Sequence, residues 1–190
     1  MIKKIIVISF MLFWLSSCFF SDDETTQKSN NTLLTKIDRK DFTMSLPSSW
    51  EVIKSNDSIF PKPAFWEIVL DAKSKNKTWN IYRNILILKE ELNKNIDSLD
   101  YIVSNYLWAK KNYYYIKLLK DINVLIDNKK TKIYVFEAKY SEDTPIYKFI
   151  QTWIVCSKEA YIITIALEKD NNNIDRYTQL LGTFKCGKTK

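Results

Sequence analysis

The chain has 190 residues, with 29 Lys and Arg against 22 Asp and Glu and a formal net charge of +7. It contains no histidine and only two glycines, which excludes histidine-based triads, histidine metal ligands and glycine-rich phosphate loops. We therefore expect a protein that is not an enzyme and that holds no metal and no cofactor.

The first 17 residues have the pattern of an export signal. Lys3 and Lys4 precede an uncharged apolar stretch over 5–15, which is shorter than the roughly 20 residues of a membrane-spanning helix. An ordinary signal peptide and an uncleaved anchor helix are the alternatives that share these features.

Leu15-Ser16-Ser17-Cys18 follows directly and resembles the bacterial lipobox, in which an aliphatic residue and two small residues precede a cysteine. The resemblance implies cleavage between Ser17 and Cys18 and the attachment of lipid, palmitate included, to Cys18. Several acyl chains on one residue hold a protein stably in a bilayer. We therefore expect a lipoprotein anchored to the cell membrane or outer membrane, with its domain outside the cytoplasm.

The stretch over 18–36 behind Cys18 is polar over 21–32, where it has no aromatic residue and no apolar periodicity. Such a composition buries too little surface to fold, so we interpret it as a flexible tether. The folded domain is expected over 37–187.

Alternating apolar and polar residues predict β-strands before and after a helix. Short links between the last four strands favour antiparallel hairpins. The expected strands are Phe42–Leu46, a short segment opening at Trp50, Phe65–Ala72, Trp79–Lys89, Tyr115–Ile126, Thr131–Tyr140, Ile146–Ser157 and Ala160–Glu168.

Two helices are expected, each with one apolar stripe. An antiparallel sheet flanked by these helices, an α+β fold, is the simplest way to bury both stripes. Asp97 or Ser98 caps the first helix, which ends near Asn112, and Gly187 stands where a glycine is expected after the second. The stripes are Leu99, Ile102, Val103, Tyr106, Leu107 and Tyr113 in the first helix, and Ile174, Tyr177, Leu180, Leu181 and Phe184 in the second.

Several short motifs resemble those of PsbP-like domains. The segment Phe42–Trp50 has the family's spacing of apolar residues, proline and tryptophan, and Ser98-Leu99-Asp100-Tyr101, Tyr161-Ile162-Ile163-Thr164 and Leu181-Gly182-Thr183-Phe184 follow in the family's order. The resemblance spans Ile37 to Phe184 and implies an α/β/α sandwich. Members of that family are mostly binding or accessory proteins, and the resemblance brings no catalytic residues.

Two cysteines remain beside Cys18, namely Cys156 and Cys186. Export would place them where disulfides form, and a loop of this length would stabilise the fold by about 3–4 kcal/mol. Two unpaired thiols, with Cys156 buried in a strand, are the alternative.

Lysines are scattered over several loops, among them Lys129, Lys130 and Lys132 in one and Lys185 and Lys188 at the end. A solvated surface explains them. Attraction to anionic lipid head groups or to an acidic partner is the alternative. Nucleic acid is not expected as a partner of an exported chain.

Aromatic residues make up 14% of the chain. Packing in the core explains most of them, but Trp and Tyr are also favoured in recognition surfaces. The candidates for a binding surface, chosen because they stand near the ends of elements, are Trp66, Trp108, Tyr113, Tyr114 and Tyr115.

We expect a membrane-anchored, non-enzymatic binding or accessory module of the cell envelope, which meets the bilayer through acylated Cys18 and has an envelope protein as its partner. An immunity or inhibitor lipoprotein that neutralises an extracytoplasmic toxin is the first alternative, and an enzyme of unknown class is the second.

Overall fold

The computed structural model describes residues 33–54, 66–78 and 81–187, without the side chains of 107–109 and 112. The motif at Cys18 and the expected tether up to residue 32 therefore lie outside the described residues. Neither helix in the described ranges is long and apolar enough to cross a membrane.

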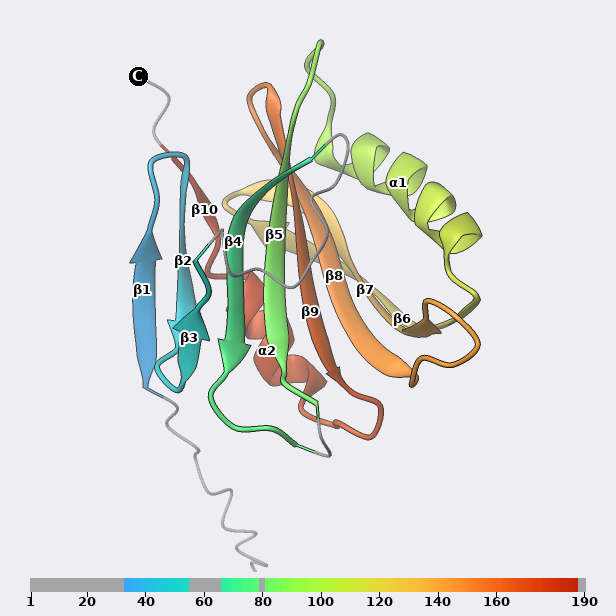
Figure 1. Ribbon diagram of the computed structural model, residues 1–190. Helices are drawn as coiled ribbons and strands as arrows, with labels where there is room; N and C mark the ends of the chain where they lie inside the picture. The colour runs from blue at the N-terminus through green and yellow to red at the C-terminus, as the bar shows by residue number, and fades with distance from the viewer. Residues whose placement is uncertain (1–32, 55–65, 79–80, 188–190) are drawn as a thin grey trace, which may run out of the picture. The chain divides into compact units, whose positions relative to one another are not determined.

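A seven-stranded antiparallel sheet forms the centre of the folded part (Figure 1). Its strand order is β3-β4-β5-β9-β8-β7-β6, so each hairpin from β6 to β9 joins neighbours, as predicted. The strands are β3 (Trp50–Val52), β4 (Glu67–Ser74), β5 (Asn84–Glu91), β6 (Tyr115–Ile126), β7 (Lys129–Lys139), β8 (Tyr147–Cys156) and β9 (Glu159–Glu168).

A second, three-stranded sheet has the order β1-β2-β10. Strand β2 (Phe42–Pro47) was predicted, whereas β1 (Leu34–Asp38) and β10 (Lys185–Cys186) were not. Strand β1 begins before the domain boundary that the sequence suggested at Ile37. The residues of β1 are mostly exposed, and Leu34 is 50% exposed, so the strand has no apolar pattern from which it could be predicted.

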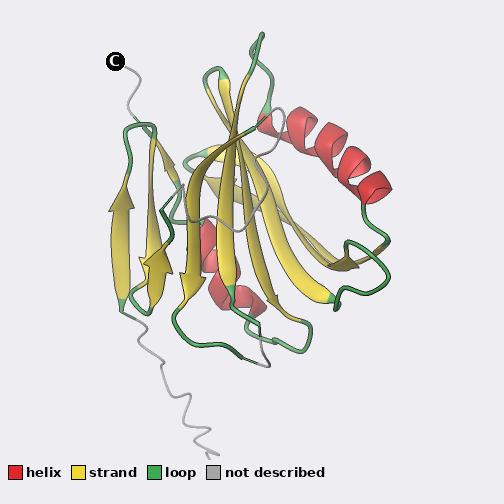
Figure 2. Ribbon diagram, in the orientation of Figure 1, coloured by secondary structure: helices red, strands yellow, loops and turns green. Residues whose placement is uncertain are grey.

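Helices and the small sheet cover the two faces of the large sheet, which confirms the predicted α+β class (Figure 2). Helix α1 (Ser98–Asn112) packs on β7 and β8 at one face. Helix α2 (Ile174–Leu181) and β2 pack on the other face. Successive side chains of a strand point to opposite faces of the sheet, so β7 contributes to the core on each face. Its Tyr134 and Phe136 face α1, while its Ile133 and Val135 face α2.

Helix α1 has the predicted bounds, and the Asp97 side chain accepts a hydrogen bond of 2.7 Å from the Leu99 amide. Its buried stripe is shifted from the predicted one. Tyr101 and Ile102 are buried, whereas Val103 is 49% exposed. Successive helical residues point about 100° apart, so a stripe centred on Ile102 turns Val103 toward solvent.

Helix α2 ends at Leu181, so Phe184 lies beyond it, although that ring is fully buried as predicted. Gly187 does not end a helix, because β10 intervenes. Its amide donates a hydrogen bond of 2.7 Å to the Asp41 carbonyl, and a Cβ there would lie 2.6 Å from the Asp41 carbonyl carbon. Close approach of two backbones, rather than a helix end, requires this glycine.

Strand β5 begins at Asn84, later than the strand predicted from Trp79. Residues 79 and 80 lie outside the described ranges. Thr78 and Ile81, on either side of them, bond to each other's backbone at 2.8 and 2.9 Å before the strand begins.

Candidate functional site

Trp66 is tied to the start of α1. Its Nε1 donates a hydrogen bond of 3.1 Å to Oε2 of Glu90, and the Tyr101 hydroxyl donates to the same oxygen. Burial, the hydrogen bond to Glu90 and its charge raise the pKa of Tyr101, so this hydroxyl keeps its proton. The arrangement links the start of α1 to the end of β5 and gives Trp66 a structural role.

The remaining candidates are separated from Trp66 by the length of α1, since Tyr101 and Tyr113 are about 18 Å apart along its axis. The side chain of Trp108 lies outside the described residues. Tyr115 is half-buried and pairs with Lys139 of β7. The five candidates therefore do not form one surface.

Tyr113 and Tyr114 do belong to a cluster of rings at the end of α1. The Tyr113 ring lies 5.1 Å from that of Tyr140, and Lys139 stands 4.8 Å above the ring of Tyr114. Tyr147 joins through Phe149, whose ring centre lies 6.1 Å away. We call Tyr113, Tyr114, Tyr140 and Tyr147 the tyrosine patch.

The patch combines a rigid base with exposed rings. Tyr114 is 60% exposed and Tyr140 58%, whereas Tyr113 packs against Phe136 and Phe149. Burial raises the pKa of Tyr113. Tyrosine rings offer a large contact area with little loss of side-chain entropy, and their hydroxyls add hydrogen bonds, which suits a protein contact.

Sequence reasoning missed Tyr140 and Tyr147. They flank the loop between β7 and β8, and that loop is brought to the end of α1 by the pairing of β6 with β7. The expected hairpin of the strands 115–126 and 131–140 could have found them, because pairing these strands outward from their turn places the end of β7 opposite Tyr115.

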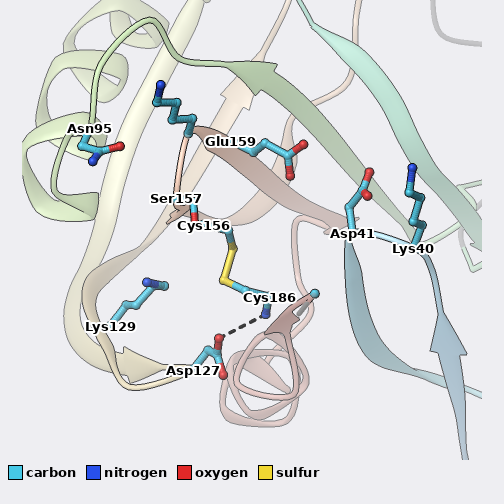
Figure 3. A pocket seen from close by; sticks show the side chains of 11 residues that line it. Lys40, Asp41, Asn95, Asp127, Lys129, Cys156, Ser157, Glu159 and Cys186 are labelled. Atoms are coloured by element: carbon cyan, nitrogen blue, oxygen red, sulfur yellow. Dashed lines mark hydrogen bonds between the residues drawn. A yellow bond between two sulfur atoms is a disulfide. The ribbon is translucent and has the colours of Figure 1, made fainter. Parts of the chain in front are cut away.

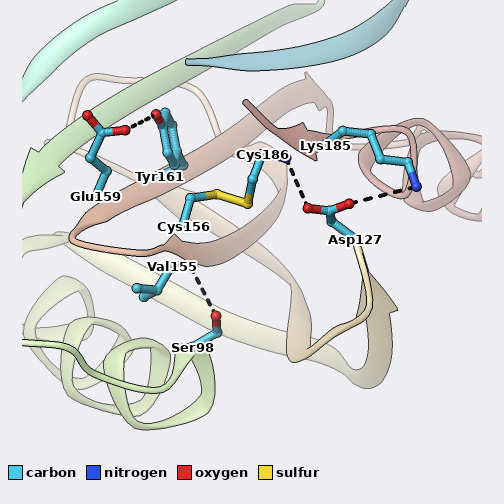
Figure 4. Close-up of a disulfide and its surroundings, with 8 residues drawn as sticks. All are labelled: Ser98, Asp127, Val155, Cys156, Glu159, Tyr161, Lys185 and Cys186. Carbon is cyan, nitrogen blue, oxygen red and sulfur yellow. Dashed lines mark hydrogen bonds and ion pairs between the residues drawn. A yellow bond between two sulfur atoms is a disulfide. The ribbon is translucent and has the colours of Figure 1, made fainter. Parts of the chain in front are cut away.

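Cys156 and Cys186 form a disulfide, with Cα atoms 5.7 Å apart (Figure 4). Cys156 ends β8 and Cys186 belongs to β10, so the bond joins the large sheet to the small one. The Cys186 amide also donates a hydrogen bond of 3.1 Å to Oδ2 of Asp127, in the turn between β6 and β7. Three distant segments are thereby fixed together.

An open pocket of about 1010 Å³ lies beside this disulfide (Figure 3). The turns between β1 and β2, between β6 and β7, and between β8 and β9 all contribute to it, together with the loop before α1. Its lining is charged, and consists of Lys40, Asp41, Asn95, Asp127, Lys129, Cys156, Ser157, Lys158, Glu159, Cys186 and Gly187.

Lys89 lies behind two of the pocket's carboxylates. Its ammonium is 3.0 Å from Asp41, 3.5 Å from Glu159 and 3.6 Å from Glu67. Burial lowers the pKa of Lys89, but the hydrogen bond to Asp41 and the three negative charges outweigh that effect and raise it. Glu159 also accepts a hydrogen bond of 2.7 Å from the Tyr161 hydroxyl.

Among the described residues, no group of three Cys, Asp or Glu side chains is placed to hold a metal ion. The pocket lining instead combines three lysines with three carboxylates.

No protein-family model matches the chain, and no curated protein matches it in sequence. Its likeness is to solved structures. The solution structure of cyanobacterial PsbP from Synechocystis sp. PCC 6803 is 8% identical with a TM-score of 0.57, and covers 82% of this chain and 93% of that one. The crystal structure of a protein of unknown function from Pseudomonas aeruginosa is 13% identical with a TM-score of 0.52, and covers 79% and 94%. At these identities the likeness shows the fold alone, and that fold is PsbP-like.

Proposed function

We propose that the protein is a lipid-anchored, non-enzymatic binding or accessory protein of the cell envelope, which contacts an envelope protein through the tyrosine patch. The observation that carries this proposal is the packing of Tyr113, Tyr140 and Tyr147 around Phe149, beside Tyr114 under Lys139, with Tyr114 and Tyr140 more than half exposed. Exposed tyrosines held by a rigid base resemble the aromatic anchors that dominate protein interfaces.

Two features support the location. Leu15-Ser16-Ser17-Cys18 has the pattern of a lipidation site behind an export signal. The disulfide between Cys156 and Cys186 is a bond of the kind found in oxidising compartments outside the cytoplasm.

The anchor is tested by Cys18→Ser in the full-length protein. We expect the variant to lose incorporation of labelled palmitate and to move from the membrane to the soluble fraction, because the acyl chains supply the bilayer affinity. A circular dichroism melt like that of the wild type serves as the control for folding. A variant that stays in the membrane fraction contradicts the lipid anchor.

The contact surface is tested by placing a photoreactive phenylalanine analogue at Tyr140 in the full chain and irradiating intact cells. We expect a discrete crosslinked protein at this position. The matched control carries the analogue at Leu125, which is exposed on β6 away from the patch. Crosslinking that is absent at Tyr140, or the same at both positions, contradicts the proposal, and the identity of the adduct separates an accessory role from inhibition of a toxin.

A further inference from the structure

Strand β6 carries a row of exposed leucines along one edge of the large sheet, where it is the last strand beside β7 (Figure 1). Of the nine large apolar side chains that are exposed in the described ranges, three lie on this strand. We call them the leucine row: Leu118 at 45%, Leu119 at 39% and Leu125 at 67%. Its ends are about 20 Å apart along the strand. Single exposed leucines are ordinary, whereas a row of this length is typical of a contact surface.

The hairpin of β6 and β7 is also basic. Over 115–139 it holds six lysines against three carboxylates. Asp121 and Asp127 are already paired with lysines, at 2.8 and 3.8 Å, and Glu137 is half-buried. Three exposed lysines of the hairpin are in no ion pair with any residue that the structure describes, and we call them the hairpin lysines: Lys117, Lys120 and Lys130. The leucine row therefore lies in a positive field.

The pairing of β6 with β7 places lysines beside the leucines. Leu125 lies opposite Lys130, so their side chains project from the same face of the sheet. Leu118 projects from that face too, since its partner Phe136 faces α1. Lys120, which follows the bulge, projects from the other face. A flat partner that meets the sheet edge-on therefore touches leucines and lysines together.

A second strand fits this edge poorly. The register shift between Leu118 and Lys120 interrupts the row of backbone groups with which another strand would pair. A lipid surface needs none of those groups, because side chains alone contact it. Apolar side chains next to lysines are the composition of segments that lie at the boundary between anionic head groups and acyl chains.

We propose that the β6 edge docks on an anionic lipid surface, with the leucine row at the head-group boundary and the hairpin lysines on the lipid phosphates. The inference rests on the lipid anchor proposed above, which keeps the domain beside a bilayer and so populates even a weak contact. The anchor holds one end of the chain, whereas the β6 contact orients the folded domain.

The test measures spin-label accessibility on the full-length lipidated protein in vesicles of phosphatidylcholine and phosphatidylglycerol. A nitroxide on Leu125→Cys reports the contact, and the matched control is Val52→Cys, which is exposed on β3 at the opposite edge of the same sheet. We expect the accessibility of the Leu125 label to a water-soluble nickel chelate to fall at least twofold relative to vesicles of phosphatidylcholine alone, while that of the Val52 label is unchanged. Equal accessibility of the two labels in both kinds of vesicle overturns the proposal.

The contribution of charge is tested on the same label. Changing the three hairpin lysines to Gln should restore the accessibility of the Leu125 label in the anionic vesicles. The matched control is Lys75→Gln, Lys94→Gln and Lys169→Gln, which removes the same charge from exposed loops and should leave the label shielded. Equal effects of the two triple changes, or equal shielding in both kinds of vesicle, overturn the assignment to anionic lipid. Shielding that is already present in detergent indicates a second copy on this edge and overturns the lipid contact.

The chain without an introduced cysteine separates this inference from the proposed anchor. It should take up no nitroxide, because Cys18 is acylated under that proposal and Cys156 and Cys186 are bonded to each other. Label on Cys18 contradicts the anchor alone, and the same accessibility measurements are then made with Cys18→Ser as the parent chain. An acylated chain whose Leu125 label stays accessible in anionic vesicles contradicts the β6 contact alone.

Discussion

Glu168 shows how a single buried charge is held at the end of β9. Both of its oxygens accept the Arg83 Nε, at 3.0 and 2.9 Å, and Asn171 donates to Oε1 at 3.0 Å. Burial raises the pKa of this carboxyl, but the bonds from Arg83 and Asn171 outweigh burial and hold the pKa below its usual range. The ionised form is therefore the one that the fold stabilises.

We expect Glu168→Gln to lower the free energy of unfolding by about 3 kcal/mol, because it leaves the charge of Arg83 half-buried without its partner. Urea denaturation at pH 7 measures this, and Glu142→Gln, an exposed loop residue, serves as the control. Because the folded pKa is lowered, the contribution of Glu168 is present above the usual carboxyl value and is lost as the pH falls through the folded pKa. The gap between wild type and variant should therefore narrow in acid, and a gap that is constant with pH would contradict this account.

At the scale of elements, β6 is an edge strand of the large sheet, and it has features that discourage another strand from pairing with it. It is twelve residues long and pairs only with β7 among the described strands. Leu118, Leu119 and Leu125 are exposed, which would invite another strand to pair. The register shifts between Leu118 and Lys120, and exposed Lys117 and Lys120 stand on either side of this bulge. Bulges and lysines are devices that discourage pairing at sheet edges.

We expect Lys117→Val with Lys120→Val to make the protein associate, because the change removes both charges from the edge and raises its strand propensity. Sedimentation velocity on the detergent-solubilised chain measures the association. The control is Lys94→Val with Lys169→Val, which removes the same charge from loops. A double variant that sediments as the wild type does would show that the bulge alone protects the edge.

Strands and helices with a strong local pattern were predictable from the sequence, and elements defined by distant partners were not. Strand β6 and helix α1 have the predicted bounds because their apolar spacing and the Asp97 cap are local signals. Strand β10 has only two residues and exists because it pairs with β2, at the other end of the domain. Local sequence patterns do not indicate a pairing between residues so far apart in the chain.

The same reasoning applies to the two candidate sites. Tyr113 and Tyr114 were visible as a cluster in sequence, but Tyr140 joins them only through the pairing of β6 and β7. The pocket takes its residues from turns in separate parts of the chain, and Lys89, which is not in its lining, pairs with both Asp41 and Glu159. No spacing in the sequence indicates which lysines are paired and which remain free.

For the molecule as a whole, the disulfide holds the small sheet against the large one, and the Gly187 bond to Asp41 holds β10 beside β2 within the small sheet. The bond closes a sequence separation of 30 residues. Within the described residues, the other polar links of β10 are its two pairs with β2, the contacts of Cys186 and Lys185 with Asp127, and the neighbouring Gly187 bond to Asp41. Because β10 is so short, it depends on the disulfide to stay in position.

We expect the double change Cys156→Ala and Cys186→Ala to lower the free energy of unfolding by about 3–4 kcal/mol, because the unfolded chain regains the freedom that the bond removes. Hydrogen exchange gives the sharper measurement. The Cys186 and Gly187 amides should lose protection while the amides of β8 and β9 keep it, since the pairing of those strands does not involve the bond. Wild type treated with reductant serves as the matched comparison and should show the same pattern. Equal loss of protection across β8, β9 and β10 would mean that the disulfide supports the whole core rather than the junction of the two sheets.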